Sequence, residues 1–550
     1  MMTQPQPGVF RRRVQKAAAL MIVAACCGST SCGSGSGDLP PQRLLVVGWD
    51  GATFDVLDPL IREGRLPHLA ALIAAGRSAT LESTKIPISS AAWPTISTGK
   101  SPGEHGVYSF FRPLENSYDA RLISAKDVDA PPIWRTLVAR GHTVHVWGVP
   151  VTFPPEAVRG TLVAGMLSPE GAEYAHPPGF TDKLRSEGYV PDMGVWRQNQ
   201  APYDIDRIEA QIAIKERLVV EQLSARDWSY SMVVFKSLDV LCHRPVQNLR
   251  RPDVLRLIER LDVALGKLIE AAGDDTTVMV LSDHGFAEYR RTFNMHRWLM
   301  DVGYSAPNAD ARLEALPQGS LAEFKASERA ARLGQLDLDQ TRAYAVETEG
   351  PFASIRLNLK GREPQGIVSP AQAGKVLDAI AQDLLALEFP DGIAVVQAVH
   401  RGADLYPGPW SGTGELTVVP DLIVEMAPEW RCVAATFGKA ITFGEPPFPD
   451  HALQGIFAIA GKNIEPSAER GQLELLDIAP MSFLLVDEPI PTSLNGSAHS
   501  AFTRGGVLPR RIADAEDPSL IPSEEAYRDN RVDLEALQVE SQVKGFGYGK

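Results

Sequence analysis

The chain has 550 residues, of which 44% are hydrophobic and 22% are charged, and its formal net charge at pH 7 is −14. This composition is that of an ordinary globular protein with enough apolar residues for a large core. The acidic balance disfavours long polyanions and so excludes DNA and RNA polymers as main partners, whereas a small phosphorylated substrate stays compatible with it.

The amino terminus has the pattern of an export signal. Basic residues at 11–13 and at Lys16 precede an apolar run over residues 17–25, which is far shorter than the ~20 residues that span a bilayer. We therefore predict a signal peptide over residues 1–25. Residues 23–26 (VAAC) resemble a bacterial lipobox, which implies cleavage before Cys26 and attachment of a diacylglyceryl group to its sulfur. Ordinary cleavage near an Ala-x-Ala site or in the following Ser/Gly stretch is the alternative.

Residues 26–40 are rich in Gly and Ser and predict a flexible tether. Lipid on Cys26 would hold the protein at a bacterial membrane, facing the periplasm or the exterior, without spanning the bilayer. Cleavage at this site also removes four positive and no negative charges, which changes the formal charge from −14 to −18. Two cysteines beyond the tether, Cys242 and Cys432, either pair in an oxidising compartment or stay as buried thiols.

The first predicted strand covers residues 43–49, a short apolar run that ends at Asp50. It would deliver a carboxylate to the carboxyl end of a buried strand, and ligands bind at that edge of an open α/β sheet. Residues 133–141 then predict a helix and residues 142–148 a core strand.

Two later apolar runs each lead directly into a pair of side chains that can bind metals. These are residues 231–238 with Asp239 and His243, and residues 276–282 with Asp283 and His284. The first pair would share one face of a helix because its members are four residues apart. Three predicted strands therefore end in acidic or imidazole groups.

Carboxylate oxygens and imidazole nitrogens without paired thiolates suit Zn²⁺ or Mn²⁺ rather than a Cys-rich structural zinc site. A strand-end Asp taken alone is usually a cap or turn residue. A metal site is predicted only because six side chains of ligand type occur together: Asp50, Asp239, His243, Asp283, His284 and His451. Two ions ~3.5 to 4 Å apart can stabilise both the attacking and the leaving oxygen of an in-line displacement. The set therefore predicts a two-metal phosphoryl-transfer site.

A long segment separates His284 from His451, yet the two must meet in such a site. We therefore expect one sheet interrupted by an insertion. The predicted parts are a first core part at residues 41–300, an inserted cap at 301–440, a second core part at 441–505 and a polar extension at 506–550. Within the insertion, residues 352–359 predict a strand and residues 370–387 a helix.

Several segments carry a resemblance to a known family. They are residues 47–52 (VGWDGA), 87–93 (PISSAAW), 98–106 (TGKSPGEHG), 239–243 (DVLCH), 282–285 (SDHG) and 451–455 (HALQG), with auxiliary stretches at 149–155 (VPVTFPP) and 358–366 (NLKGREPQG). Together they resemble the alkaline phosphatase superfamily, specifically its type I phosphodiesterase and nucleotide pyrophosphatase branch. The resemblance implies an α/β fold whose central, mostly parallel sheet is flanked by helices and carries an inserted cap subdomain.

The resemblance also implies a role for each side chain. One divalent ion would be held by Asp50, Asp283 and His284, and the other by Asp239, His243 and His451. Ser89 would bridge toward the first ion as the nucleophile, because a serine hydroxyl needs a base or a coordinated cation to lower its pKa. Ser90 and Thr84 are the alternative nucleophiles. Zn²⁺ is the first choice of metal, and Mn²⁺ is the alternative.

The sequence departs from the family pattern at Ala92, where nucleotide pyrophosphatases carry an Asn that contacts a phosphate oxygen. A helix that began at Ser89 would also contain Pro94 in its second turn, where proline removes an N–H and clashes with the preceding turn. The helix therefore either begins near Trp93, with Pro94 in the tolerated first position, or is kinked, and we expect the late start. Among the other histidines, we expect His105 to make structural hydrogen bonds and His296 to lie on an exposed loop.

These expectations combine into one function. The protein would be a metal-dependent hydrolase of phosphodiester or phosphoanhydride bonds, with a serine nucleophile, two divalent metal ions and a small phosphorylated substrate. The alternatives are a phosphomonoesterase or phosphonate hydrolase on the same site, or a noncatalytic surface-binding lipoprotein.

Overall fold

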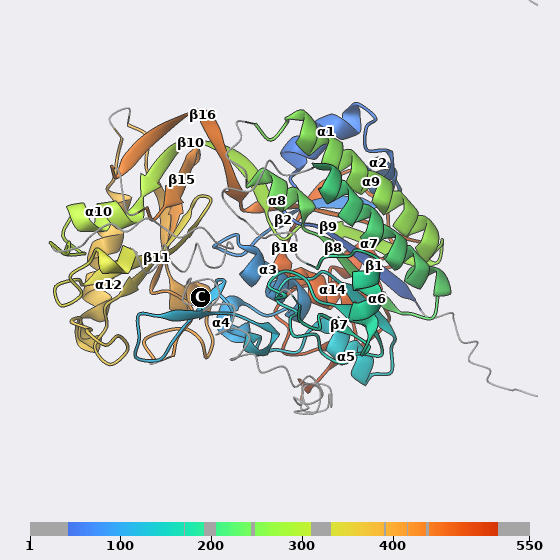
Figure 1. The fold of residues 1–550 in the computed structure, drawn as a ribbon, viewed down its shortest axis with the longest axis horizontal. Coiled ribbons are helices and arrows are strands. Elements are labelled where there is room, and N and C mark those ends of the chain that lie inside the picture. Colours follow the sequence, from blue (N-terminus) through green and yellow to red (C-terminus); the bar gives the residue numbers. More distant parts are fainter. Residues whose placement is uncertain are drawn as a thin grey trace, which may run out of the picture. The chain divides into compact units, whose positions relative to one another are not determined.

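The fold is built on a nine-stranded sheet whose central strands are continuous apolar runs (Figure 1). This computed structural model describes residues 42–169, 171–191, 205–243, 248–309, 332–389, 392–414, 416–435 and 439–514. The predicted signal peptide, Cys26 with its tether, and residues 515–550 of the predicted extension lie outside these ranges. All of these described residues belong to one compact unit.

The central sheet is mostly parallel, as expected. Its strands in spatial order are β18 (Arg470–Glu474), β2 (Arg77–Glu82), β17 (Gln454–Ala460), β9 (Thr276–Leu281), β1 (Arg43–Trp49), β8 (Tyr230–Phe235), β5 (Val144–Trp147), β6 (Gly160–Val163) and β7 (Ala175–His176). β1 pairs in parallel with both β8 and β9, whereas β17 pairs antiparallel with β2 and β9 and β7 pairs antiparallel with β6. The predicted strands at residues 43–49, 142–148, 231–238 and 276–282 are confirmed with small shifts of their ends.

Helices cover both faces of this sheet, which explains why its strands are apolar on both sides. In β1, Leu45 and Val47 pack into one hydrophobic cluster, whereas Leu44 and Val46 pack into a second. The first cluster includes residues of α1 (Phe54–Arg62), α2 (Pro67–Ala75), α6 (Phe180–Ser186), α7 (Ile205–Ala225), α8 (Ser237–Cys242) and α9 (Pro252–Ala272). The second includes residues of α3 (Ser89–Thr98), α5 (Ile133–Ala139) and α14 (Ile478–Leu485). Figure 1 shows α7 and α9 side by side on the first of these faces.

Two smaller sheets lie between β9 and β17 in the chain. One contains β11 (Ala343–Glu349), β12 (Phe352–Leu357), β14 (Leu422–Met426) and β13 (Val396–Arg401), and the other contains β15 (Trp430–Val433), β10 (Gly285–Asn294) and β16 (Ile441–Ala452). They share a hydrophobic cluster with α10 (Met295–Asp301) and α12 (Pro370–Leu385). The predicted strand at residues 352–359 is β12, and the predicted helix at 370–387 is α12.

The remaining elements are short. They are α4 (Pro102–His105), α13 (Gly402–Leu405), the strand pair β3 (Phe111–Pro113) and β4 (Ala120–Leu122), and the strand pair β19 (Ile490–Pro491) and β20 (Arg511–Ile512). Among the described residues, no helix combines the length and the apolar composition that crossing a bilayer requires.

Candidate metal centre

Six of the seven predicted side chains lie next to strand ends at one edge of the central sheet, and this position brings them to the site. β1, β8 and β9 run in parallel, so the residues after them, including Asp50, Asp239 and Asp283, meet at their carboxyl ends. β17 runs the opposite way, so the segment just before it, with His451, reaches the same edge. Pairing of β10 with β16 places His451 opposite Phe286, two residues from His284.

One group of ligand-type atoms surrounds the hydroxyl of Ser89. Ser89 Oγ lies 3.4 Å from Asp50 Oδ1 and 3.3 Å from His284 Nε2. His284 Nε2 in turn lies 3.4 Å from Asp283 Oδ2 and 3.6 Å from Asp50 Oδ1. This is the first set that the resemblance implied.

A second group is formed by Asp239 of α8, by His243, which directly follows this helix, and by His451. Asp239 Oδ1 lies 3.0 Å from His243 Nε2 and 3.2 Å from His451 Nε2, and the two ring nitrogens are 2.7 Å apart. The predicted helical spacing of Asp239 and His243 is confirmed, because α8 turns both side chains to the same side. These three residues are the second implied set.

The two groups adjoin. The rings of His284 and His451 stack with centroids 3.8 Å apart and planes inclined by 26°. Asp239, His284 and His451 also offer one atom each within 4.8 Å of one another. The structure therefore holds two neighbouring ligand groups, as a pair of closely spaced cations requires.

Backbone carbonyls orient two of the imidazoles. His284 Nδ1 lies 3.1 Å from the carbonyl oxygen of Gly285, and His451 Nδ1 lies 2.7 Å from that of Pro87. Since a carbonyl oxygen only accepts, each Nδ1 carries a proton, which leaves Nε2 as the ring atom available to a metal ion. This is the arrangement in which histidine binds a metal ion.

The carboxylates of the first group are fully buried, and no lysine or arginine among the described residues forms an ion pair with them. Burial raises the pKa of Asp50 well above its ordinary value, and repulsion by Asp283 and Asp239 adds to the rise. Burial and the charge of Asp239 likewise raise the pKa of Asp283 to about 7. Asp283 Oδ1 accepts a hydrogen bond from Gly51 N at 3.3 Å, but its buried Oδ2 accepts none among the described residues. Such a set fits a divalent cation, which would supply the missing positive charge.

The second group is electrostatically different. Burial acts to raise the pKa of Asp239, but His243 and His451 outweigh it and the pKa falls well below the ordinary value. Burial acts to lower the pKa of His451, but Glu349 and Asp239 outweigh it and raise it to about 9. Lys236 adds an ammonium group 3.8 Å from Asp239 Oδ2.

The helix that carries Ser89 differs from the prediction. α3 begins at Ser89, not near Trp93, and contains Pro94 in its interior. The expectation was wrong because tertiary contacts outweigh the local cost of proline: every residue of α3 is buried, and Trp93 Nε1 donates a hydrogen bond to Asp50 Oδ2 at 3.0 Å. Ala92 is fully buried and belongs to the second hydrophobic cluster.

The three candidate nucleophiles have different surroundings. Only the hydroxyl of Ser89 is recorded in contact with the ligand groups. Ser90 is fully buried and its Oγ has no hydrogen-bond partner in the described part of the chain, whereas Thr84 Oγ1 donates to the carbonyl oxygen of Ile86 at 2.7 Å.

Sequence reasoning missed Glu349, the last residue of β11. Its carboxylate joins ring nitrogens of His243 and His451 in a group whose atoms lie within 4.8 Å of one another. No motif marks this position, and only the pairing of β11 with β12 brings it to the site.

Other expectations concern side chains outside the ligand groups. His105 is buried, with Nε2 3.0 Å from Thr95 Oγ1, and it accepts a hydrogen bond from Val107 N, so its structural role is confirmed. The expectation that His296 lies on an exposed loop was wrong. His296 is buried on α10, and this helix packs against the smaller sheets. Cys242 and Cys432 are buried free thiols.

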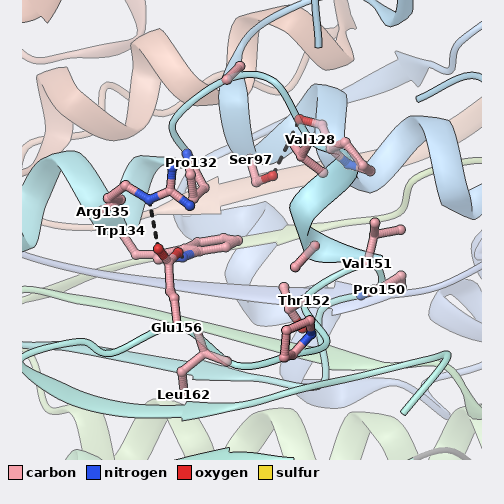
Figure 2. Close-up of a pocket in the computed structure, with 14 residues that line it drawn as sticks. Ser97, Val128, Pro132, Trp134, Arg135, Pro150, Val151, Thr152, Glu156 and Leu162 are labelled. Carbon is pink, nitrogen blue, oxygen red and sulfur yellow. Dashed lines mark hydrogen bonds and ion pairs between the residues drawn. The ribbon is translucent and has the colours of Figure 1, made fainter. Parts of the chain in front are cut away.

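A separate hollow lies beside the far part of α3 (Figure 2). Ser97, Thr152 and Trp134 are among its lining residues, and none of the seven predicted site residues is. Glu156 at its wall accepts hydrogen bonds from Trp134 Nε1 and Arg135 Nε, each at 2.6 Å. The charge of Glu156 is thus paired with Arg135, unlike the carboxylates of the first ligand group.

Comparison with known proteins agrees with this geometry. A model of the type I phosphodiesterase / nucleotide pyrophosphatase family matches residues 44–444. The match covers most of the chain, and the chain therefore belongs to this family. Proteins of this family are metal-dependent hydrolases of phosphoester bonds, so the protein is an enzyme of that class. No curated protein sequence matches the chain.

Solved structures share the fold. Phosphonoacetate hydrolase from Sinorhizobium meliloti 1021, in complex with phosphonoformate, has a TM-score of 0.54 at 15% identity, covering 82% of this chain and 96% of that one. Human ectonucleotide pyrophosphatase / phosphodiesterase 5 has a TM-score of 0.51 at 15% identity, covering 84% of this chain and all of that one (100%). These likenesses confirm the alkaline phosphatase-like architecture.

Proposed function

We propose that this protein hydrolyses phosphodiester or phosphoanhydride bonds with Ser89 as nucleophile and two divalent metal ions. Zn²⁺ is the first choice of metal, and Mn²⁺ is the alternative. One observation carries the proposal: two adjoining groups of buried carboxylates and imidazoles meet beside a single serine hydroxyl. Family membership supplies the reaction class, and the donor set of oxygen and nitrogen atoms supports these metals.

Asp50, Asp283 and His284 would hold one ion, and Asp239, His243 and His451 the other. When bound, the ions would supply Lewis-acid charge that lowers the pKa of a hydroxyl and stabilises negative charge on phosphoryl oxygens. The chain itself contributes the Nε2 atoms of the oriented imidazoles and the buried carboxylates.

Ser89 then attacks phosphorus, and the leaving oxygen departs on the side of Asp239, His243 and His451. Because Ser89 lies in the first turn of α3, the substrate anion is near the positive end of that helix, which favours negative charge. Water subsequently attacks the phosphoryl-serine, releases the phosphoryl product and restores the hydroxyl. Burial of α3 keeps Ser89 in position for both displacements.

The test compares Ser89→Ala with Ser90→Ala. The substrates are bis-p-nitrophenyl phosphate and p-nitrophenyl phosphate, with metal content measured for each protein. We expect the wild type to prefer the diester, Ser89→Ala to lose at least about a thousandfold in kcat while keeping its metal, and Ser90→Ala to stay close to wild type. Activity that survives Ser89→Ala would contradict the role of Ser89, and preference for the monoester would favour a phosphomonoesterase.

We further propose that lipid on Cys26 anchors the exported protein to a bacterial membrane. The support comes from the lipobox-like residues 23–26 and the Gly/Ser-rich tether behind them. Mass spectrometry of the amino-terminal peptide from a bacterial host should show a diacylglyceryl-modified cysteine that Cys26→Ala removes and Cys27→Ala retains. An unmodified amino terminus that begins elsewhere would contradict the anchor.

A further inference from the structure

The carboxylate of Glu349 lies beside the second ligand group, although the residue comes from the smaller four-stranded sheet. Glu349 Oε1 is 3.8 Å from His451 Nδ1. A carboxylate oxygen of Glu349 also lies within 4.8 Å of ring nitrogens of His243 and His451. Since His451 Nδ1 already donates to the carbonyl oxygen of Pro87 at 2.7 Å, Glu349 is not needed to orient that ring.

The turn between β11 and β12 fixes this position. Gly350 has a φ of +52°, and a Cβ added there would lie 2.0 Å from the carbonyl oxygen of His451. Gly350 N donates to Asp450 Oδ1 at 3.3 Å, and Gly350 O accepts from Cys432 N at 2.8 Å. Only glycine allows so close an approach, so the backbone itself holds Glu349 against the site.

Glu349 is itself buried, with a side chain that is 9% exposed, but it adjoins His243, the most exposed member of the second group. The His243 side chain is 30% exposed, whereas those of Asp239 and His451 are each 4% exposed and that of His284 is fully buried. A substrate therefore approaches the ligand groups past His243, next to the carboxylate of Glu349.

We propose that Glu349 is a specificity-determining residue that favours singly charged phosphodiesters over doubly charged phosphomonoesters. The inference rests on the proposed function, because it assumes a phosphate bound at Ser89. A fixed negative charge repels a dianion twice as strongly as a monoanion at the same place. Replacement of Glu349 by Gln removes one formal negative charge beside the second group.

The test uses Glu349→Gln, which keeps the shape of the side chain, in the full-length, metal-loaded protein. Asp378→Asn is the matched control, because it removes one negative charge from α12, where the side chain is 80% exposed. Calorimetry at about pH 8.5 measures Kd for inorganic phosphate, mostly a dianion, and for dimethyl phosphate, a monoanion. Metal content and the ratio of kcat/KM for diester and monoester are measured on the same proteins.

We expect Glu349→Gln to bind dimethyl phosphate about tenfold and inorganic phosphate about a hundredfold more tightly, because each unit of ligand charge contributes equally. The diester-to-monoester ratio of kcat/KM should fall about tenfold, while the control stays at wild-type values. Unchanged phosphate affinity would overturn the inference, and loss of bound metal would make Glu349 a ligand instead. Failure of the proposed function appears differently, as a wild-type protein that hydrolyses no phosphodiester or does not need Ser89.

Discussion

The protein contains two buried clusters of charged side chains that differ in how their charges are balanced. In the smaller four-stranded sheet, Arg362 Nη2 lies 2.7 Å from Asp421 Oδ2 and Arg362 Nε lies 2.8 Å from Glu363 Oε1. Arg356 donates to Thr417 Oγ1 and to the Thr417 carbonyl oxygen, each at 3.0 Å. Around Ser89, by contrast, Asp50 and Asp283 are buried with raised pKa values, and Asp283 Oδ2 accepts no hydrogen bond among the described residues.

This difference in charge balance predicts different roles for the two clusters, one in stability and the other in function. A buried ion pair that is matched within the protein costs several kcal/mol when one partner is removed, because the other charge stays behind unpaired. Buried acids that lack a cationic partner are costly in the metal-free protein and become favourable only when a cation binds. We therefore expect the family-like segment at residues 358–366 to stabilise the fold, and the groups around Ser89 to serve the reaction.

The largest expected effect comes from removing a ligand at the unbalanced cluster. Asp283→Asn should lower kcat/KM for bis-p-nitrophenyl phosphate by about a thousandfold or more, since several kcal/mol of transition-state stabilisation depend on the bound cations. Metal analysis should show a loss of bound ion. The thermal stability of the metal-free variant should equal or exceed that of the metal-free wild type, because a poorly solvated charge is gone. A clear drop in metal-free stability would contradict the comparison.

The balanced cluster should respond in the opposite way. Arg362→Met should lower the free energy of unfolding by about 3–5 kcal/mol, because it leaves Asp421 and Glu363 buried and unpaired. Denaturant unfolding measures the change, and the folded fraction should keep its metal. Lys183→Met breaks a pair with Glu221 whose side chains are 44% and 60% exposed, so it serves as the control and should change stability by less than about 1 kcal/mol.

The thermal stability of the metal-free protein should depend on pH, because the pKa of Asp283 is raised. The pKa of Asp283 is raised to about 7, so the folded state binds more protons than the unfolded state below that pH. Its contribution to stability is therefore present in acid and is lost as pH rises toward about 7. Melting temperatures of metal-free wild type and Asp283→Asn should converge at low pH and diverge in favour of the variant near neutrality. Parallel curves would show that Asp283 is not perturbed.

The smallest expected effect concerns the indole that supports Asp50. Trp93→Phe removes the hydrogen bond from Nε1 to Asp50 Oδ2 and keeps most of the packing of α3. Metal affinity should weaken about 10- to 100-fold, as is typical when a partner of a metal ligand is lost. Competition with a chelator measures this, and Trp134→Phe, which removes the indole bonded to Glu156, is the matched control. An equal loss in both variants would assign the effect to general destabilisation.

Local sequence determined much of the fold and of the ligand positions. Apolar runs such as residues 43–49 predict strands because both faces of the central sheet are covered, and parallel strands bring their carboxyl ends to one edge. Asp50, Asp239 and Asp283 follow those ends directly, so their meeting at that edge could be anticipated. Their roles as metal ligands remain predictions for the experiments above.

Tertiary structure decided what local rules could not. α3 begins at Ser89 despite Pro94, because Trp93 packs against β1 and hydrogen-bonds Asp50. His296 is buried because α10 packs into the cluster of the smaller sheets. Glu349 reaches the ligand groups only because the β11–β12 turn presses Gly350 against His451, a contact between positions far apart in the chain. Periodicity and turn residues report on neighbours in sequence, whereas these contacts arise from long-range packing that no local pattern encodes.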